Sequence, residues 1–296
     1  MNLEIFIPYW GDADLLRQTV ESVRAQDDPD WHLTVLNDRD PDDSVPAYFA
    51  SLADPRITYV LNERNMGITE NFREAVRRAT GTHITIPGSD DLLQSNYVGL
   101  IKSVIARVPD VDVIQPGVDV IDHAGVAVLP LVDRVKQRLL APRGGSGIAL
   151  LRGEQMATSL IRGDWLYWPS LTFRSDTLKR IDFRDGLAVI QDLALLMDIA
   201  FDGGSLAYVP EKAFSYRRHE SSASQRTLLD GRRFRDEREY FGLAADLAEK
   251  KGWRRTARVA RLRLVARLHA VTVLPHVVRH GDSEGRRAAL AHVFGR

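Results

Sequence analysis

The stretch Ile84-Thr-Ile-Pro-Gly-Ser-Asp-Asp-Leu-Leu93 decides the fold. Its first three residues are apolar or β-branched and predict a buried strand, which Pro87 and Gly88 end in a turn. Two adjacent carboxylates, Asp90 and Asp91, follow that turn. Open α/β sheets bind ligands at the carboxyl edge of their strands. We therefore expect the two acids to lie at a binding edge.

These carboxylates suit a divalent cation. Adjacent carboxylates repel each other and stay ionised at low cost only beside water, hydrogen-bond donors or a cation. Hard oxygen ligands at a turn suit Mg²⁺ or Mn²⁺ that also carries a phosphate. An isolated Ser-Asp-Asp is more often a solvated turn or a helix cap, because short motifs are weak signals. The rest of the chain has to decide between these interpretations.

Strand and helix patterns alternate around this stretch. Short apolar runs predict strands at residues 3–7, 31–36, 57–61, 84–86, 111–115, 171–174 and 206–209. Helical spacing predicts helices at residues 15–23, 69–79, 100–108 and 193–201. Such alternation predicts a parallel sheet with right-handed crossovers. The loops after the first four strands then share one edge, where we expect these residues to converge: Asp38, Arg64, Asn65, Gly67, Asp90 and Asp91.

Composition excludes several classes of protein. The 296 residues are 44% hydrophobic, which is enough for one large α/β domain with or without an appendage. Lys and Arg number 40 and so do Asp and Glu, which argues against nucleic acid as an obligate partner. Without cysteine there is no disulfide, thiolate metal site or cysteine nucleophile. The chain shows neither a signal peptide nor a run of about 20 apolar residues, so we expect a cytoplasmic protein.

Three later motifs carry possible chemistry. The aromatic stretch from Trp165 to Ser170 could stack on a sugar ring or pack in the core. Asp192 opens a helix, where an acid is ordinarily a cap. The basic run Arg217-Arg-His219 follows a strand and could neutralise a diphosphate and ligate a metal, or form a surface turn.

From residue 228 the chain turns helical and rich in arginine, with no acid between Gly252 and His280. These arginines do not fall on one side of a helix, so the pattern is not that of a clean amphipathic surface helix. The region could rest on an anionic membrane. It could equally be a helical subdomain whose arginine stems cover apolar surface.

Taken together, the motifs resemble family 2 glycosyltransferases in their order and spacing. The motifs that carry the resemblance are Ile5-Phe-Ile-Pro-Tyr-Trp10, Asp38, Asn65-x-Gly67 with Asn71, Ser89-Asp-Asp91, Trp168-Pro-Ser170, Gln191-Asp192 and Arg218-His219. The resemblance implies an α/β GT-A fold over residues 1–225, with a nucleotide-sugar half (1–115) and an acceptor half (116–225). Residues 226–296 would form an Arg-rich helical extension.

The resemblance also implies roles for individual residues. Asp192 aligns with the general base, and Asp91 and His219 with the ligands of a divalent metal, Mn²⁺ or Mg²⁺. Residues expected on the acceptor side are Trp168, Ser170 and Gln191. Residues expected to bind the donor are Pro8, Tyr9, Asp38, Arg64, Asn65, Gly67, Ser89, Asp90, Arg217 and Arg218.

Two positions depart from the pattern of the family. Gly88 stands where many members have an acid, so one usual ribose or metal contact is missing or supplied otherwise. Gln191 replaces the glutamate of a Glu-Asp pair, which keeps the base and removes a neighbouring charge. The Gln-x-x-Arg-Trp motif of processive members is absent, which favours transfer of a single sugar.

We therefore expect an inverting, metal-assisted glycosyltransferase that moves one sugar from a nucleotide-diphosphate sugar to a glycan or lipid-linked acceptor, in polysaccharide or glycolipid biosynthesis. Peripheral contact with the inner face of a membrane through the Arg-rich end is a further hypothesis. One alternative is a non-catalytic nucleotide- or glycan-binding module, which Gly88 leaves open. A sugar nucleotidyltransferase is disfavoured, because the loop at residues 8–14 is acidic and has no basic, glycine-rich segment.

Overall fold

The computed structural model describes residues 3–142, 147–187, 189–218, 227 and 229–295. Its strands are β1 (Leu3–Tyr9), β2 (Trp31–Asn37), β3 (Ile57–Leu61), β4 (His83–Thr85), β5 (Leu92–Leu93), β6 (Val113–Ile121), β7 (Ala127–Val128), β8 (Ala149–Arg152), β9 (Thr172–Arg174) and β10 (Ser205–Arg217). They form one sheet in the order β3-β2-β1-β4-β9-β6-β10-β5, with β7 on β6 and β8 on β10.

The helices follow the strands as the sequence predicts. In the first two thirds of the chain they are α1 (Ala13–Arg24), α2 (Ser44–Leu52), α3 (Ile68–Arg78), α4 (Tyr97–Arg107), α5 (Leu131–Val135), α6 (Gly153–Arg162), α7 (Ser175–Arg180) and α8 (Gln191–Phe201). Two short helical segments are the π-helix η1 (Lys136–Leu140) and the 3-10 helix η2 (Trp168–Ser170). The C-terminal helices are α10 (Arg232–Lys250), α11 (Arg254–Leu262), α12 (Leu264–His280) and α13 (Ser283–Phe294).

The sheet is mainly parallel, which confirms the predicted fold class. β1 pairs in parallel with β2 and β4, β2 with β3, and β6 with β10. β9 lies between β4 and β6 and runs antiparallel to both, and β5, β7 and β8 also pair antiparallel with their neighbours. The prediction of strands alternating with helices did not reveal these reversals.

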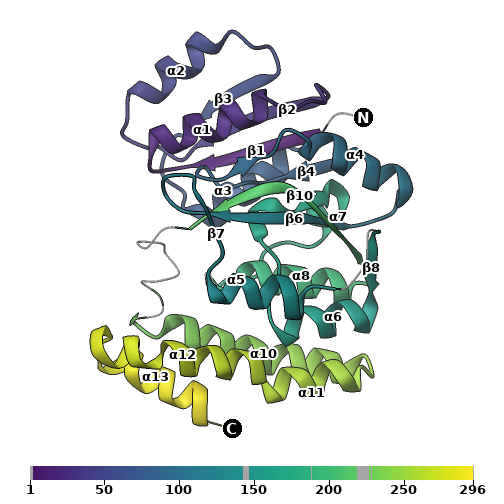
Figure 1. Ribbon diagram of the computed structural model, residues 1–296, viewed down its shortest axis with the longest axis vertical. Helices are drawn as coiled ribbons and strands as arrows, with labels where there is room; N and C mark the ends of the chain where they lie inside the picture. The colour runs from purple at the N-terminus through teal and green to yellow at the C-terminus, as the bar shows by residue number, and fades with distance from the viewer. Residues whose placement is uncertain (1–2, 143–146, 188, 219–226, 228, 296) are drawn as a thin grey trace.

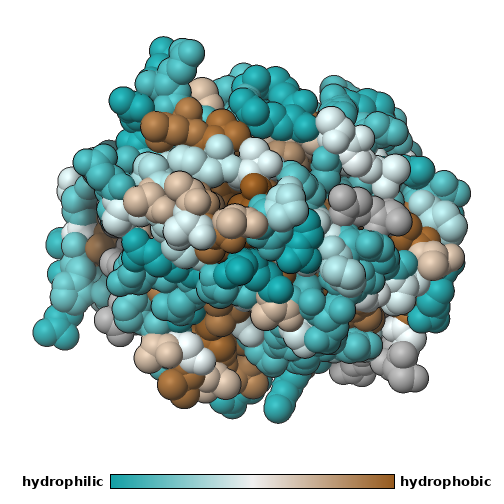
Figure 2. All heavy atoms as spheres, turned by 90° about the horizontal axis from the view of Figure 1, so that it is seen from above, coloured by the Kyte–Doolittle hydropathy of each residue, from teal (hydrophilic) through white to brown (hydrophobic). Residues whose placement is uncertain are grey.

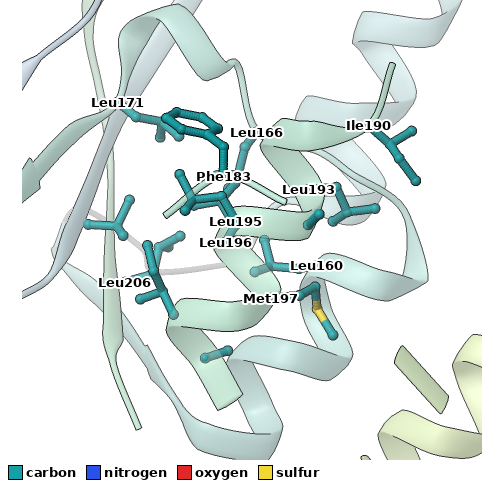
Figure 3. Close-up of a cluster of buried hydrophobic side chains, with 14 of the residues drawn as sticks. Leu160, Leu166, Leu171, Phe183, Ile190, Leu193, Leu195, Leu196, Met197 and Leu206 are labelled. Carbon is teal, nitrogen blue, oxygen red and sulfur yellow. The ribbon is translucent and has the colours of Figure 1, made fainter. Parts of the chain in front are cut away.

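Two cores cover the two faces of the sheet, as the alternation of side chains along β1 requires. Ile5 and Ile7 face one core with residues of α1 and α4, whereas Phe6 faces the other with residues of α3, α6 and α8. Figure 3 shows part of this second core, where leucines of α6 and α8 point toward one another. The sheet thus holds β1, β2 and β4 rigidly, and their carboxyl ends share one edge.

The C-terminal helices form a layer beneath α6 and α8 (Figure 1). Ala244, Ala245 and Ala248 of α10 are buried and let this helix approach α8 closely. Trp253 stacks on Phe201, with ring centroids 5.4 Å apart. The predicted helical C-terminal part is confirmed, while the exact domain boundaries stay a prediction.

The outer surface is largely polar at the end of the molecule that carries α2. Figure 2 shows this end as mostly hydrophilic, with hydrophobic residues in small separate groups. Among the described residues, no helix is both long and apolar enough to cross a membrane.

Candidate active site

A cavity of about 880 Å³ opens at the carboxyl edge of β1, β2 and β4. It is lined by residues of the loops that follow these strands, of the start of α3, and of η2. The lining residues that we predicted as donor or acceptor contacts are Pro8, Tyr9, Asp38, Asn65, Gly67, Ser89, Asp90 and Trp168. Of the residues predicted to converge, Asp38, Asn65, Gly67 and Asp90 line the cavity, whereas Arg64 and Asp91 do not. The roles of these residues stay predictions.

Asp38 organises the loop after β3. Its buried carboxylate accepts hydrogen bonds from the backbone N–H groups of Met66 and Gly67, both at 2.8 Å, and from the Asn62 amide at 3.0 Å. Gly67 has φ +81°, a left-handed conformation that favours glycine, and it precedes α3. Asp38 therefore fixes the loop that carries Asn65 into the cavity, while Arg64 on that loop is exposed.

Gly88 lets two carboxylates gather in a small space. A Cβ atom at this position would lie 2.6 Å from Asp90 Oδ1 and 2.7 Å from Asp91 Oδ2. Asp90 lines the cavity and is half-buried, whereas Asp91 is buried behind it. Burial, followed by the negative charge of Asp90, raises the pKa of Asp91 well above its usual range. The chain therefore holds two acids where one of them resists ionisation unless positive charge is nearby.

Arg217 closes this acidic turn from behind. Its backbone N–H donates to Asp91 Oδ1 at 2.8 Å. Its buried guanidinium donates to the backbone carbonyls of Asp90, Asp122 and His123 and to the side chain of Gln18. In this conformation the guanidinium positions the loops around Asp90. That Arg217 binds the donor diphosphate stays a prediction.

Arg218 also has a protein partner. Its Nε and Nη2 donate to the two oxygens of Asp133 at 2.7 and 2.8 Å, and the Tyr167 hydroxyl donates to Asp133 at 2.9 Å. Asp133 is fully buried, so this pair fixes α5 against the end of β10. Nothing in the sequence of residues 121–150 pointed to this partner.

Asp192 lies in the first turn of α8, as predicted. Burial, followed by the nearby negative charge of Asp164, raises its pKa from 3.8 to about 6. The preceding residue, Gln191, accepts a hydrogen bond from the Thr69 hydroxyl at 2.7 Å. Ile68, the neighbour of Thr69, lines the cavity. The first turn of α8 is therefore tied to the end of α3 that borders the cavity.

The two other acceptor-side candidates differ in exposure. Trp168 lines the cavity and packs against Phe72, with ring centroids 5.7 Å apart. Ser170 is fully buried, and its hydroxyl accepts a hydrogen bond from Gln115 and donates one to the Tyr167 carbonyl.

Tyr9, a candidate on the donor side, is also buried, and its hydroxyl donates to the Gly11 carbonyl at 2.9 Å. For Ser170 and Tyr9, the observed contacts hold the loops that border the cavity.

The second predicted metal ligand, His219, lies outside the described residues. Within the described part of the chain, no group of three or more His, Asp or Glu side chains is arranged to hold a metal ion. Asp90 and Asp91 each bring a carboxylate oxygen to within 2.7 Å of the Cβ position of Gly88. The side chains of Asp12, Asp38 and His123 also line the cavity.

Several cavity residues were missed as candidates. Trp10 is 63% exposed and lines the cavity directly after β1. An exposed tryptophan beside a strand end is a signal that could have been used. His123 also lines the cavity, from the turn between β6 and β7. This hairpin could have been suspected only from the turn residues Asp122 and Gly125.

Comparison with known proteins identifies the family. A model described as glycosyl transferase family 2 matches residues 4–159, more than half of the chain. The chain belongs to glycosyl transferase family 2. The matched span includes Asp38, Asn65 and the Asp90-Asp91 turn, whereas Asp192 lies beyond it.

Two relatives are biosynthetic proteins of bacteria. The chain is 31% identical to the putative colanic acid biosynthesis glycosyl transferase WcaA of Escherichia coli (strain K12) over 90 residues, 30% of this chain and 32% of the relative. It is 24% identical to the succinoglycan biosynthesis protein ExoO of Rhizobium meliloti (strain 1021) over 241 residues, 77% of this chain and 64% of the relative. The chain thus spans less than two thirds of the length of these curated relatives.

Solved structures share the fold. Residues 1–349 of S. aureus TarS match 99% of this chain and 88% of that chain, with a TM-score of 0.64 and 13% identity. The same protein in complex with UDP-GlcNAc matches 99% of this chain and 88% of that chain, with a TM-score of 0.65 and 14% identity. At this identity the likeness establishes the fold alone.

Proposed function

We propose that this family 2 member transfers one sugar from a nucleotide-diphosphate sugar to an acceptor hydroxyl, with inversion at the anomeric carbon. The observation that carries the proposal is the cavity of about 880 Å³ at the carboxyl edge of the parallel strands, where α/β sheets bind nucleotides. The S. aureus TarS complex with UDP-GlcNAc supports a nucleotide-sugar donor. The transferred sugar would be a hexose. The names of WcaA and ExoO, which refer to colanic acid and succinoglycan biosynthesis, support a role in polysaccharide biosynthesis.

The acidic turn fits a divalent cation held jointly with the donor diphosphate. Both carboxylates aim an oxygen at the small space beside Gly88. Mg²⁺ and Mn²⁺ take carboxylate and phosphate oxygens and commonly keep only one or two protein carboxylates. Asp90 and Asp91 would hold the ion, which when bound would offset the negative charge that develops on the leaving diphosphate. Burial and the charge of Asp90 oppose the ionisation of Asp91, and a bound cation would favour its ionised form.

Asp192 would act as the general base on the acceptor side. It accepts the proton of the acceptor hydroxyl as that oxygen attacks the anomeric carbon. The bond from this carbon to the diphosphate oxygen breaks, and its electron pair leaves with the nucleoside diphosphate. Attack opposite to the leaving group inverts the centre. A carboxylate with a pKa of about 6 is ionised at pH 7 and is a stronger base than an ordinary aspartate. Trp168, which lines the cavity, would offer an aromatic face to a sugar.

The base is tested by Asp192→Asn, with Asp202→Asn at the other end of α8 as the matched control. Turnover is measured as nucleoside diphosphate released from UDP-, dTDP- and GDP-sugars with glycan acceptors. We expect Asp192→Asn to lose about 10²–10⁴-fold in turnover with unchanged nucleotide binding, and the control to stay active. Native turnover should fall below a pH of about 6.

Full turnover in Asp192→Asn would contradict the role of the base. Native protein that binds nucleotide but turns over no donor would instead support the non-catalytic module.

We also propose that α12 contacts a membrane surface that carries a lipid-linked acceptor. Leu264, Leu268, Val271, Pro275 and Val278 are exposed and recur every three or four residues, which places them on one side of the helix. Ala270 and Val277 are buried on the other side. One apolar side of α12 is already covered by the protein. The other apolar side is exposed and would be stabilised by a second apolar surface. With no acid between residues 252 and 280, an anionic lipid surface suits it better than a second copy of the same basic helix.

Vesicle flotation tests this contact. Native protein should float with vesicles of phosphatidylcholine and phosphatidylglycerol, and the double variant Leu264→Ser, Leu268→Ser should remain in solution. The control Leu243→Ser removes an exposed leucine from α10 instead. Equal flotation of native protein and the double variant would contradict the proposal. The cytoplasmic location stays a prediction.

A further inference from the structure

A second cavity lies between α10 and α11, away from the candidate active site. Its volume is about 600 Å³, and it shares no lining residue with the first cavity. Figure 1 shows α10 and α11 side by side in the C-terminal layer. The charged lining residues are one glutamate and four arginines: Glu239, Arg235, Arg238, Arg261 and Arg263.

Two of these arginines have acidic partners and two do not. Arg235 pairs with Glu284 at 2.8 Å, and Arg261 pairs with Glu249. Within the part of the chain that the structure describes, neither Arg238 nor Arg263 has an ion pair. The cavity therefore presents unneutralised positive charge.

Arg263 occupies an unusual place for a cation. It is only 7% exposed and is the single residue between α11 and α12. Its φ of +48° lies in the left-handed region, where a helix break ordinarily uses glycine or asparagine. Its guanidinium reaches the Gly295 carbonyl only at 3.5 Å. Burying a charge without a partner is costly, so the presence of arginine here calls for a reason.

The neighbouring charges add to this cost. Arg267 Nη2 donates to the same Gly295 carbonyl, but its buried Nε has no hydrogen-bond partner among the described residues. Burial, together with the charges of Arg267 and Arg238, lowers the pKa of Arg263. The carbonyl at the end of α13 carries only a partial negative charge. This carbonyl and the nearby carboxylate of Glu237, which is already paired with Arg233, do not balance three guanidinium groups.

We infer that this cavity binds a phosphate or diphosphate group, held chiefly by Arg238 and Arg263. Guanidinium groups match phosphate oxygens with paired, charge-assisted hydrogen bonds. A bound phosphate would supply the negative charge that Arg263 lacks and would give the unpaired donors acceptors. The group could be free in solution or belong to a lipid headgroup, and the chemistry of recognition is the same.

The first arm of the test uses pyrophosphate with protein saturated by nucleoside diphosphate and Mn²⁺, so that the candidate active site is filled. Melting temperature is followed in native protein, Arg238→Gln and Arg263→Asn, of which the last keeps a residue that tolerates left-handed backbone. The exposed Arg258→Gln is the control. The second arm measures flotation of the same proteins, each also carrying Leu264→Ser and Leu268→Ser to remove the contact through α12, with vesicles of phosphatidylcholine containing phosphatidic acid.

A pyrophosphate-dependent rise in melting temperature that Arg238→Gln and Arg263→Asn both lose would establish a site for free phosphate groups. Flotation lost in both variants but kept in the control would establish a lipid headgroup as the source. If neither readout differs between native protein and the two variants, the inference is wrong. Binding of nucleoside diphosphate is also measured on each protein. Loss of donor binding can then be distinguished from loss of phosphate binding at this cavity.

Discussion

At the scale of single residues, Gly88 explains how the acidic turn can exist. Any side chain at this position would collide with the carboxylates of both Asp90 and Asp91. The acid that many family members carry here could not be accommodated without moving these groups. The departure from the family pattern is therefore coupled to the positions of the two neighbouring carboxylates, and it gives no argument by itself for a non-catalytic protein.

Gly88→Ala should weaken metal-dependent nucleotide binding by about tenfold or more, because the added methyl group pushes apart two carboxylates that would share one cation. The atoms in its way are the ends of side chains, so the fold should remain. Calorimetric titration with UDP and Mn²⁺ measures the change. Gly99→Ala in α4, whose nearest contact would be at 4.0 Å, is the control. Unchanged affinity in Gly88→Ala would exclude a cation between the two acids.

The ionised carboxylate of Asp192 should lower the free energy of unfolding at neutral pH. The pKa of Asp192 is about 6 in the folded protein, whereas its ordinary value is 3.8. Between about pH 4 and pH 6 the folded state therefore binds a proton more readily than the unfolded state does. The destabilising effect of its charge is therefore present above pH 6 and fades as the pH falls toward 4. We expect Asp192→Asn to raise the melting temperature by about 2 °C at pH 7.5 and to leave it unchanged near pH 4. A lower melting temperature at pH 7.5 would contradict this account.

At the scale of elements, α5 is attached to the sheet by one buried carboxylate. Asp133 accepts two hydrogen bonds from Arg218 and one from Tyr167. Arg218 follows β10 directly and lies beside Arg217, which holds the Asp90-Asp91 turn. The position of α5 and the geometry of the acidic turn therefore depend on adjacent residues of one strand end.

Asp133→Ala should destabilise the protein by about 1–3 kcal/mol, because it leaves the buried Tyr167 hydroxyl and the Arg218 guanidinium, whose side chain is 40% exposed, without their acceptor. Urea unfolding at pH 7 measures the loss. In contrast, Asp202→Ala removes an exposed pair with Arg180 and should cost no more than about 0.5 kcal/mol. Similar losses in the two variants would mean that Asp133 contributes only as a surface charge does.

At the scale of the whole molecule, one core joins the α/β part to the C-terminal helices. The core that includes Phe6 of β1 and Leu195 of α8 extends to Tyr240 and Ala257 in the C-terminal layer. The helix that carries Asp192 is thus packed between the sheet and α10, where the Tyr240 hydroxyl donates to the Ala194 carbonyl. The C-terminal helices lie outside the residues that the family model matches. They nevertheless pack against the helix that carries the candidate base.

Much of this architecture could be predicted because it depends on local patterns. Short apolar runs locate β1, β2 and β3, and parallel pairing then brings Asp38, Asn65 and Asp90 to one edge. The reversed direction of β9 could not be predicted, because three residues carry no signal for strand direction. The partner of Arg218 could not be predicted either, since Asp133 lies in a region without clear periodicity and meets it only in the folded chain.

Calorimetric titration with UDP, dTDP and GDP, each with and without Mn²⁺, tests the central claim most directly. We predict that one nucleotide binds native protein in a metal-dependent manner, and that Asp91→Asn, which keeps the shape of the side chain, removes the metal dependence. The donor class would then be known, leaving the sugar and the acceptor to identify. Absence of binding by every nucleotide with Mn²⁺ would contradict the claim that the cavity beside Asp90 and Asp91 is a nucleotide-sugar site.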